Sequence, residues 1–368
     1  MADPRVVKLA NLLIHYSLEI KPGAQLEITT NSQAEELLHE VYAEAIRAGA
    51  NVFLRLEDPQ TWAIFYKYAS DAQLDFVSPV NRLVSEHFDA SLHILAEQNT
   101  RSLSGVDPAK QARRAKAGQP LSKIFLERAA RGELRWCLTA FPTHASAMEA
   151  DMSLEDYRDF VFTSGKLDLD DPVSAWKKEG QRMRELQSWL DGRSQVQLKG
   201  ADIDLKLSVK GRPFIVCDGK ENFPDGEIFT GPVEESANGW VRFHYPAIYS
   251  GHEVQDVELW FEDGKVVREK ASKGDNFLTG LLNTDAGARY LGELGIGTNY
   301  DIPRFTKDML FDEKLGGTIH LALGEGYPET GSHNESGIHW DMLCDMHDGE
   351  ITADGELFYK DGKPVAWS

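Results

Sequence analysis

His339 and Asp341 form the densest pair of potentially reactive side chains in this sequence. Only Trp340 separates them, and residues i and i+2 of a β-strand point to the same face of a sheet. An imidazole and a carboxylate on one face can bind a divalent metal ion, or can form a structural hydrogen bond within the sheet. The pair alone leaves both interpretations open.

A second histidine, His320, lies in an alternating segment that predicts a strand over residues 318–324. The apolar residues at 319, 321 and 323 share the buried face. His320 falls on the other face beside Thr318 and Ala322, whose small side chains leave room for an ion or a substrate. A structural histidine is the alternative.

Tyr327 follows this segment beyond Gly324-Glu325-Gly326. A glycine-containing stretch is flexible enough to direct a phenol into a cleft. Packing of the ring on the surface is the alternative interpretation.

Two glutamates complete the set of candidates. Pro224 and Gly226 constrain the backbone just before Glu227, so its carboxylate would extend from a stiff loop. Glu293 ends a helix predicted near residues 277–291, and Gly292, Gly295 and Gly297 are interpreted as a helix stop and turn. A carboxylate is unfavourable at a helix C-terminus, and metal ligation would explain it there. Together the candidates match a two-metal hydrolase.

The first half of the chain must form a scaffold of alternating helices and strands. Apolar spacing predicts helices over residues 4–18, 34–48, 108–130 and 172–190, and strands over residues 25–29, 51–56, 91–96 and 135–140. Strands separated by such helices pair in parallel, with right-handed crossovers. Residues 1–192 are therefore predicted to form an open α/β sheet domain.

Residues 193–368 are predicted to form a second, antiparallel β-rich domain that carries the metal site. Asp263-Gly264 and Asp361-Gly362 each lie between alternating apolar runs. Asp-Gly in that position is a strong hairpin signal, because glycine accepts the positive φ that tight hairpin turns require. The predicted fold class is α/β followed by mainly β.

Composition narrows the possible functions further. The 368 residues carry a net charge of −20, which argues against nucleic acid as a partner. Much of the excess acidic charge falls after residue 200, as a cation-binding domain would require, although solubility alone explains an acidic surface equally well. No apolar run is long enough to span a membrane.

Targeting signals and several common motifs are missing. The start lacks the pattern of a signal peptide, and three cysteines provide no disulfide framework, so we expect a cytoplasmic protein. The first strand is not followed by GxGxxG, and no Walker A, GxSxG or HExxH sequence occurs.

The second half resembles the thermophilic metalloaminopeptidase family, that of aminopeptidases T and S. The resemblance is carried by Asn-Phe-Pro-Asp-Gly-Glu-Ile-Phe-Thr at 222–230, Gly-Ala-Arg-Tyr-Leu-Gly-Glu at 287–293, Leu-Phe-Asp-Glu at 310–313, Ile-His-Leu-Ala-Leu-Gly at 319–324 and Ile-His-Trp-Asp-Met at 338–342. It is diffuse in the first half.

This resemblance implies which residues act and how. It implies that two divalent metal ions, Zn, Co or Mn, are bound by Glu227, Glu293, His320, His339 and Asp341, and that Tyr327 is the catalytic tyrosine. Glu313 occupies the place of a further acidic ligand, but it lies seven residues before His320, a wider spacing than the family pattern. The resemblance also implies a cytoplasmic homodimer that cleaves the N-terminal residue from peptides.

Two other classes of protein remain open at this point. The same ligands could serve a different di-metal hydrolase, such as an amidase or a phosphoesterase, although no basic phosphate clamp accompanies them. A non-catalytic binding or structural protein, in which the His and Glu residues only stabilise the fold, is the second alternative.

Overall fold

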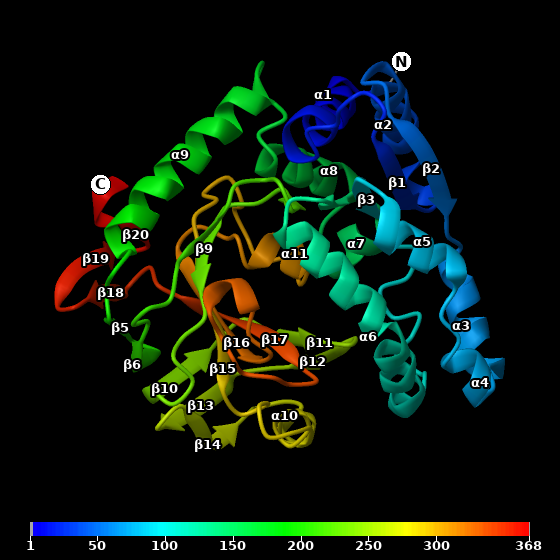
Figure 1. The fold of residues 1–368 in the computed structure, drawn as a ribbon. Coiled ribbons are helices and arrows are strands. Elements are labelled where there is room, and N and C mark those ends of the chain that lie inside the picture. Colours follow the sequence, from blue (N-terminus) through cyan, green and yellow to red (C-terminus); the bar gives the residue numbers. More distant parts are fainter. Residues whose placement is uncertain (1–2, 368) are drawn as a thin grey trace. The chain divides into compact units, whose positions relative to one another are not determined.

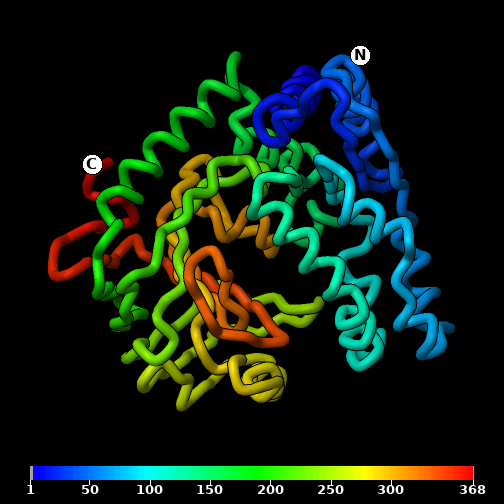
Figure 2. Tube along the Cα trace, in the orientation of Figure 1, coloured from blue at the N-terminus to red at the C-terminus, as the bar shows by residue number. Residues whose placement is uncertain are grey.

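The computed structural model describes residues 3–367, which divide into two compact units (Figures 1 and 2). One unit comprises the chain up to Val173 together with Gly219–Pro224, and the other comprises Ser174–Asp218 and the chain from Asp225 onward. Among the described residues, no helix has the length and apolar character needed to cross a membrane.

The first unit is built on a parallel five-stranded sheet of order β2-β1-β3-β4-β8. Its strands are β1 (Gln25–Thr30), β2 (Asn51–Leu56), β3 (Ala90–Leu95), β4 (Arg135–Ala140) and β8 (Asn222–Phe223). Its helices are α1 (Pro4–Leu12), α2 (Glu35–Arg47), α3 (Pro59–Tyr68), α4 (Asp71–Leu74), α5 (Pro79–His87), α6 (Pro108–Ala130), α7 (His144–Glu149) and α8 (Leu154–Ser164). The predicted parallel α/β sheet is confirmed.

Helix starts in this unit follow from local sequence. Asp3 and Asp107 accept hydrogen bonds from backbone N–H groups at the starts of α1 and α6, and a proline follows each of them at the first helical position. An Asp cap satisfies a backbone N–H that has no partner within the helix, and proline lacks the N–H that would otherwise be unpaired there.

The second unit holds one long helix, two large antiparallel sheets and a two-stranded antiparallel sheet formed by β11 (Ala247–Tyr249) and β12 (His252–Val254). The eight-stranded sheet contains β14 (Lys265–Lys270), β13 (Val257–Glu262), β10 (Asn238–Phe243), β6 (Ile203–Ser208), β5 (Gln195–Gly200), β18 (Glu350–Ala353), β19 (Glu356–Lys360) and β20 (Lys363–Pro364), in that order. The five-stranded sheet contains β17 (His339–Asp345), β16 (Thr318–Gly324), β15 (Leu291–Gly297), β9 (Glu227–Thr230) and β7 (Ile215–Cys217). The remaining elements are α9 (Pro172–Leu190), α10 (Asp275–Leu282) and α11 (Met309–Asp312).

A single hydrophobic core joins the two sheets. It combines Leu205, Val241 and Leu259 of the larger sheet with Leu294 and Leu321 of the smaller one. Because successive side chains of a strand alternate between faces, the opposite face of the smaller sheet is left for other side chains. That face carries the candidate site.

Helix α9 also packs into this core, through Met183, Leu186 and Leu190. The compact units divide at the start of α9, between Val173 and Ser174, whereas the boundary expected from the sequence follows the helix, at Gly192. The short strand β8 leaves the second half of the chain and pairs with β4.

Both predicted Asp-Gly turns have the positive φ that hairpins of this kind require. Asp263 and Gly264 have φ of 46° and 82°, and Asp361 and Gly362 have φ of 50° and 78°. The pairs Glu262–Lys265 and Lys360–Lys363 close the two hairpins.

One predicted element is wrong. The helix expected over residues 277–291 ends at Leu282, and residues 291–297 form strand β15 instead of a helix stop and turn. Gly292, Gly295 and Gly297 allow close approach of neighbouring groups in this strand, which explains why glycine occurs there without a turn.

Candidate metal centre

Five candidate residues meet on the face of the smaller sheet that is turned away from the core. Glu227 lies on β9, Glu293 on β15, His320 on β16, and His339 and Asp341 on β17. These four strands are consecutive neighbours in the sheet. In β16 and β17 the intervening residues Leu321, Trp340 and Met342 enter the core, so strand alternation itself separates the polar set from the apolar one.

The five side chains form two groups that could each hold a metal ion. Glu227, Glu293 and His320 are the first ligand group, and Glu293, His339 and Asp341 are the second. Within each group the potential ligand atoms lie within 4.8 Å of one another.

Glu293 belongs to both groups through different oxygens. Its Oε1 lies 3.1 Å from Nε2 of His320, and its Oε2 lies 3.6 Å from Nε2 of His339. A carboxylate arranged in this way can bridge two cations. This corrects the sequence interpretation of Glu293 as a helix-terminal residue, because Glu293 lies within strand β15 and its carboxylate lies beside His320 and His339.

Gly295 creates the space for the His320 ring. It pairs with His320 across β15 and β16, and a Cβ atom at position 295 would lie 2.0 Å from the ring atoms Cε1 and Nε2. No larger residue fits at position 295 while the imidazole keeps its place.

Several buried polar atoms of the centre have no hydrogen-bond partner in the described structure. Glu227 Oε2 and Asp341 Oδ1 are two such acceptors, one in each ligand group. Unpaired buried acceptors are costly, and a cation bound in each ligand group would remove that cost. Carboxylate oxygens with imidazole nitrogens suit Zn, Co or Mn, so these residues fit a divalent metal.

The orientation of His339 is fixed from outside the group. Its Nδ1 lies 2.8 Å from the backbone carbonyl of Glu325, as expected for a ring N–H that donates to that oxygen. Its Nε2 then faces Glu293 Oε2 at 3.6 Å and Asp341 Oδ2 at 3.3 Å. Histidine ligands of metals commonly make this kind of second hydrogen bond.

Charges crowded into a buried space shift the pKa values of the side chains. Burial raises the pKa of Glu293, and the nearby charges of Asp341 and Glu227 add to the rise. Burial alone would lower the pKa of His320, but its hydrogen bond to Glu293 and the charge of Glu227 raise it to about 10. The pKa of His339 also rises to about 10, because Asp341 outweighs burial. Protons therefore bind where a metal ion would bind.

Tyr327 lies at the edge of the centre. Its ring centroid is 5.0 Å from that of His339 and 5.7 Å from that of Phe229, and the residue is 41% exposed. Partial burial and the negative charges of Glu293 and Asp341 raise its pKa, so the hydroxyl keeps its proton and can donate it in a hydrogen bond.

Glu313 belongs to neither ligand group. Its carboxylate accepts a hydrogen bond from Lys314, whose Nζ also donates to Glu227 Oε1 at 2.7 Å. Burial raises the pKa of Glu313 to about 7, although the Lys314 charge opposes this. The sequence analysis missed Lys314. Its position among Leu310, Phe311 and Leu315 was an available signal, because a lysine is rarely buried without an acidic partner.

The chain is similar to known aminopeptidases over nearly its whole length. The chain is 27% identical to aminopeptidase 2 of Geobacillus stearothermophilus, over 95% of this chain and 94% of that protein. It is also 27% identical to aminopeptidase T of Thermus thermophilus, over 96% and 95% of the two chains. The solved structure of wild-type AmpT from Thermus thermophilus has the same fold, with a TM-score of 0.84, 24% identity, and coverage of 98% of this chain and 99% of that one.

The sequence model of one family extends over nearly the whole chain. It matches residues 2–363, and these include all seven candidate site residues in the second unit. The chain therefore belongs to the thermophilic metalloprotease family, M29.

Proposed function

We propose that this protein is a metal-dependent aminopeptidase that hydrolyses the N-terminal residue from peptides. The observation that carries the proposal is Glu293, whose two oxygens face two separate ligand groups. The names of the full-length relatives support the same activity.

We propose five ligands for two divalent ions, Zn, Co or Mn. Glu227 and His320 would hold the first ion, His339 and Asp341 the second, with Glu293 shared between them. Bound ions would supply Lewis-acid activation of water and of the scissile carbonyl. Glu313 would support Lys314 rather than bind an ion directly, because it accepts from that lysine and belongs to neither ligand group.

The protein's own groups would complete the reaction. The Tyr327 hydroxyl, which keeps its proton, would donate a hydrogen bond to the oxyanion that forms when water attacks the carbonyl. A metal ion or a nearby carboxylate would hold the free α-amine of the substrate, and this would restrict cleavage to the first peptide bond. The acidic surface would favour the approach of such cationic substrates.

Metal removal tests the proposal. Dialysis against EDTA should abolish cleavage of an aminoacyl chromogenic amide, and Co, Mn or Zn should restore it with about two ions bound per chain. The same amide with an acetylated amine should not be cleaved, and a phosphoester should remain intact. Full activity in metal-free protein would refute a metal-dependent mechanism, and preferred cleavage of the phosphoester would indicate a phosphoesterase instead.

Three further features belong to the proposal. The second unit, with the stretch 193–368 as its main part, would be the catalytic domain. The protein would be cytoplasmic, which suits cysteines that form no disulfide. It would act as a homodimer, and sedimentation at micromolar concentration measures this directly.

A further inference from the structure

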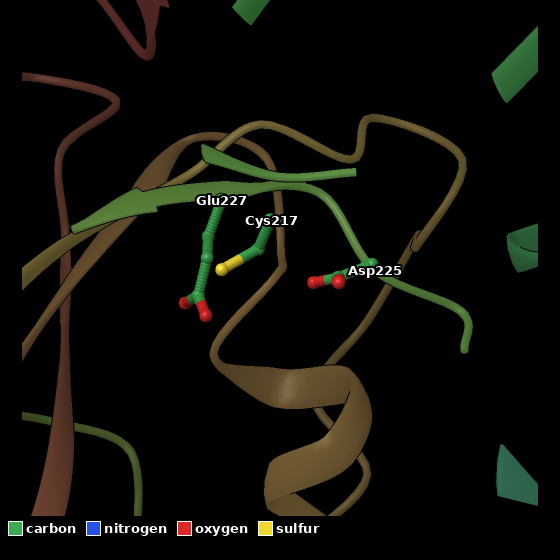
Figure 3. Close-up of side chains that lie close together, drawn as sticks. All are labelled: Cys217, Asp225 and Glu227. Atoms are coloured by element: carbon green, nitrogen blue, oxygen red, sulfur yellow. The ribbon is translucent and has the colours of Figure 1, made fainter. Parts of the chain in front are cut away.

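Beside the two ligand groups lies a third set of residues with metal-binding character. Cys217, Asp225 and Glu227 bring a thiol and two carboxylates within 4.8 Å of one another. In Figure 3 the Cys217 thiol lies between the two carboxyl groups. The strands explain the arrangement, because Cys217 pairs directly with Glu227 across β7 and β9. We call these three residues the third group.

Lys314 already supplies a cation to this third group. The residue is fully buried, and its Nζ lies 2.7 Å from Glu227 Oε1 and 3.7 Å from Asp225 Oδ1. The same Nζ also donates to Glu313. Of the three N–H donors of this ammonium group, two go to Glu227 and Glu313, while Asp225 lies at ion-pair distance.

Lys314 also determines how Glu227 is used. One oxygen of Glu227, Oε1, accepts from the lysine. The other oxygen, Oε2, is buried without a hydrogen-bond partner and lies 3.3 Å from His320 Nε2. The lysine therefore directs a single oxygen of Glu227 toward the first ligand group.

Charge balance leads to the same conclusion. Asp225, Glu227, Glu293, Glu313 and Asp341 bring five carboxylates into one buried region. Two divalent ions would neutralise four of these charges, and the Lys314 ammonium would neutralise the fifth. A third divalent ion would leave the region with excess positive charge, which is expensive inside a protein.

We propose that the Lys314 ammonium is a resident cation that occupies the third group, limits the centre to two metal ions, and positions Glu227 for the first of them. This inference rests on the proposed function, since it assumes metal ions at the first and second ligand groups. Lys314 acts through Glu227 and is thus a positioning residue.

Cobalt binding to full-length Lys314→Ala and wild-type protein tests this proposal. The substitution removes the ammonium and opens space beside Asp225 and Glu227 of the third group. We expect Lys314→Ala to bind one more Co²⁺ per chain than the wild type, and to gain a thiolate-to-cobalt charge-transfer absorption in the near ultraviolet. The double variant Lys314→Ala, Cys217→Ser should lack that absorption. A Lys314→Ala protein with the wild-type stoichiometry and spectrum would overturn the proposal.

The wild type provides a second measurement that does not depend on how the variant folds. In excess Co²⁺ it should bind two ions and show no thiolate-to-cobalt absorption, because the ammonium holds the third position. The appearance of that absorption in the wild type would overturn the proposal. A wild type that binds no cobalt would instead contradict the proposed function, so the two failures are distinguishable.

Discussion

The sequence predicted the chemical type of the group at Tyr327, but not which side chains its ring contacts. Its type and its place after a glycine-containing stretch suggested a phenol directed into a cleft, and the structure places its ring against His339 and Phe229. Lys314 was not predicted, because its function depends on three carboxylates that are brought together only by folding. Sequence patterns reveal ligand types more readily than the counter-charges around them.

Replacement of Tyr327 by Phe removes one hydroxyl and little else. We expect kcat to fall by about 10²–10³-fold, the usual effect of losing one oxyanion-hole donor, while the metal content stays unchanged. Tyr68→Phe is the matched control, since Tyr68 is 72% exposed on the first unit. Steady-state kinetics with metal analysis measure both quantities, and an unchanged kcat would remove Tyr327 from the mechanism.

The two histidines predict a pH dependence of metal uptake. The pKa values of His320 and His339 are raised to about 10, so both rings are protonated at neutral pH before metal binds. Metal ligation requires the neutral ring, so each ring must lose a proton when metal binds. For each of these protons, the apparent metal affinity should increase about tenfold for every unit by which the pH rises, as long as the pH stays below that pKa. Calorimetric titration with Co²⁺ near pH 6 and near pH 8 measures this. An affinity that is independent of pH would contradict these protonation states.

At the scale of elements, alternating strands were predictable and the glycine-rich strand was not. β16 and β17 show regular alternation of apolar and polar residues, and their site residues lie on the expected face. β15 contains three glycines among seven residues, a composition that is rare in strands and suggests a turn. The reason for glycine lies in the neighbouring strand, where the His320 ring occupies the space above Gly295.

Gly295→Ala should therefore damage the metal centre through a neighbouring strand. The new methyl group would collide with the His320 ring, and overpacking of this kind costs about 1–3 kcal/mol. We expect the variant to lose affinity for metal and most of its activity. Gly280→Ala is the control, since a Cβ at this position in α10 meets no atom within 4 Å and alanine favours a helix. Equal metal binding by both variants, measured by calorimetry, would show that His320 has more freedom than the structure indicates.

At the scale of the whole molecule, the sequence indicated a parallel α/β part followed by a β-rich part, and both are confirmed. The division of the chain was harder to foresee. β8 contains two residues, too few to carry a pattern, yet it pairs with β4 more than 80 positions earlier in the chain. Short strands that join a distant sheet depend on tertiary contacts, which local periodicity does not record.

All candidate ligands lie in the second unit, so metal should stabilise the two units differently. A ligand at about 100 times its Kd stabilises the state that binds it by about 2.7 kcal/mol. Backbone amides that exchange only when this structure opens should then exchange about 100-fold more slowly. We expect Co²⁺ to slow hydrogen exchange in β9, β15, β16 and β17, and to leave β1, β3 and β4 unchanged. Exchange measured by mass spectrometry on EDTA-treated and cobalt-loaded protein resolves these segments.

The variant Gly295→Ala should lose most of this protection, whereas Gly280→Ala should retain it. Uniform protection of both units would show that the metal stabilises the chain as one cooperative body and not through the sheet that carries its ligands.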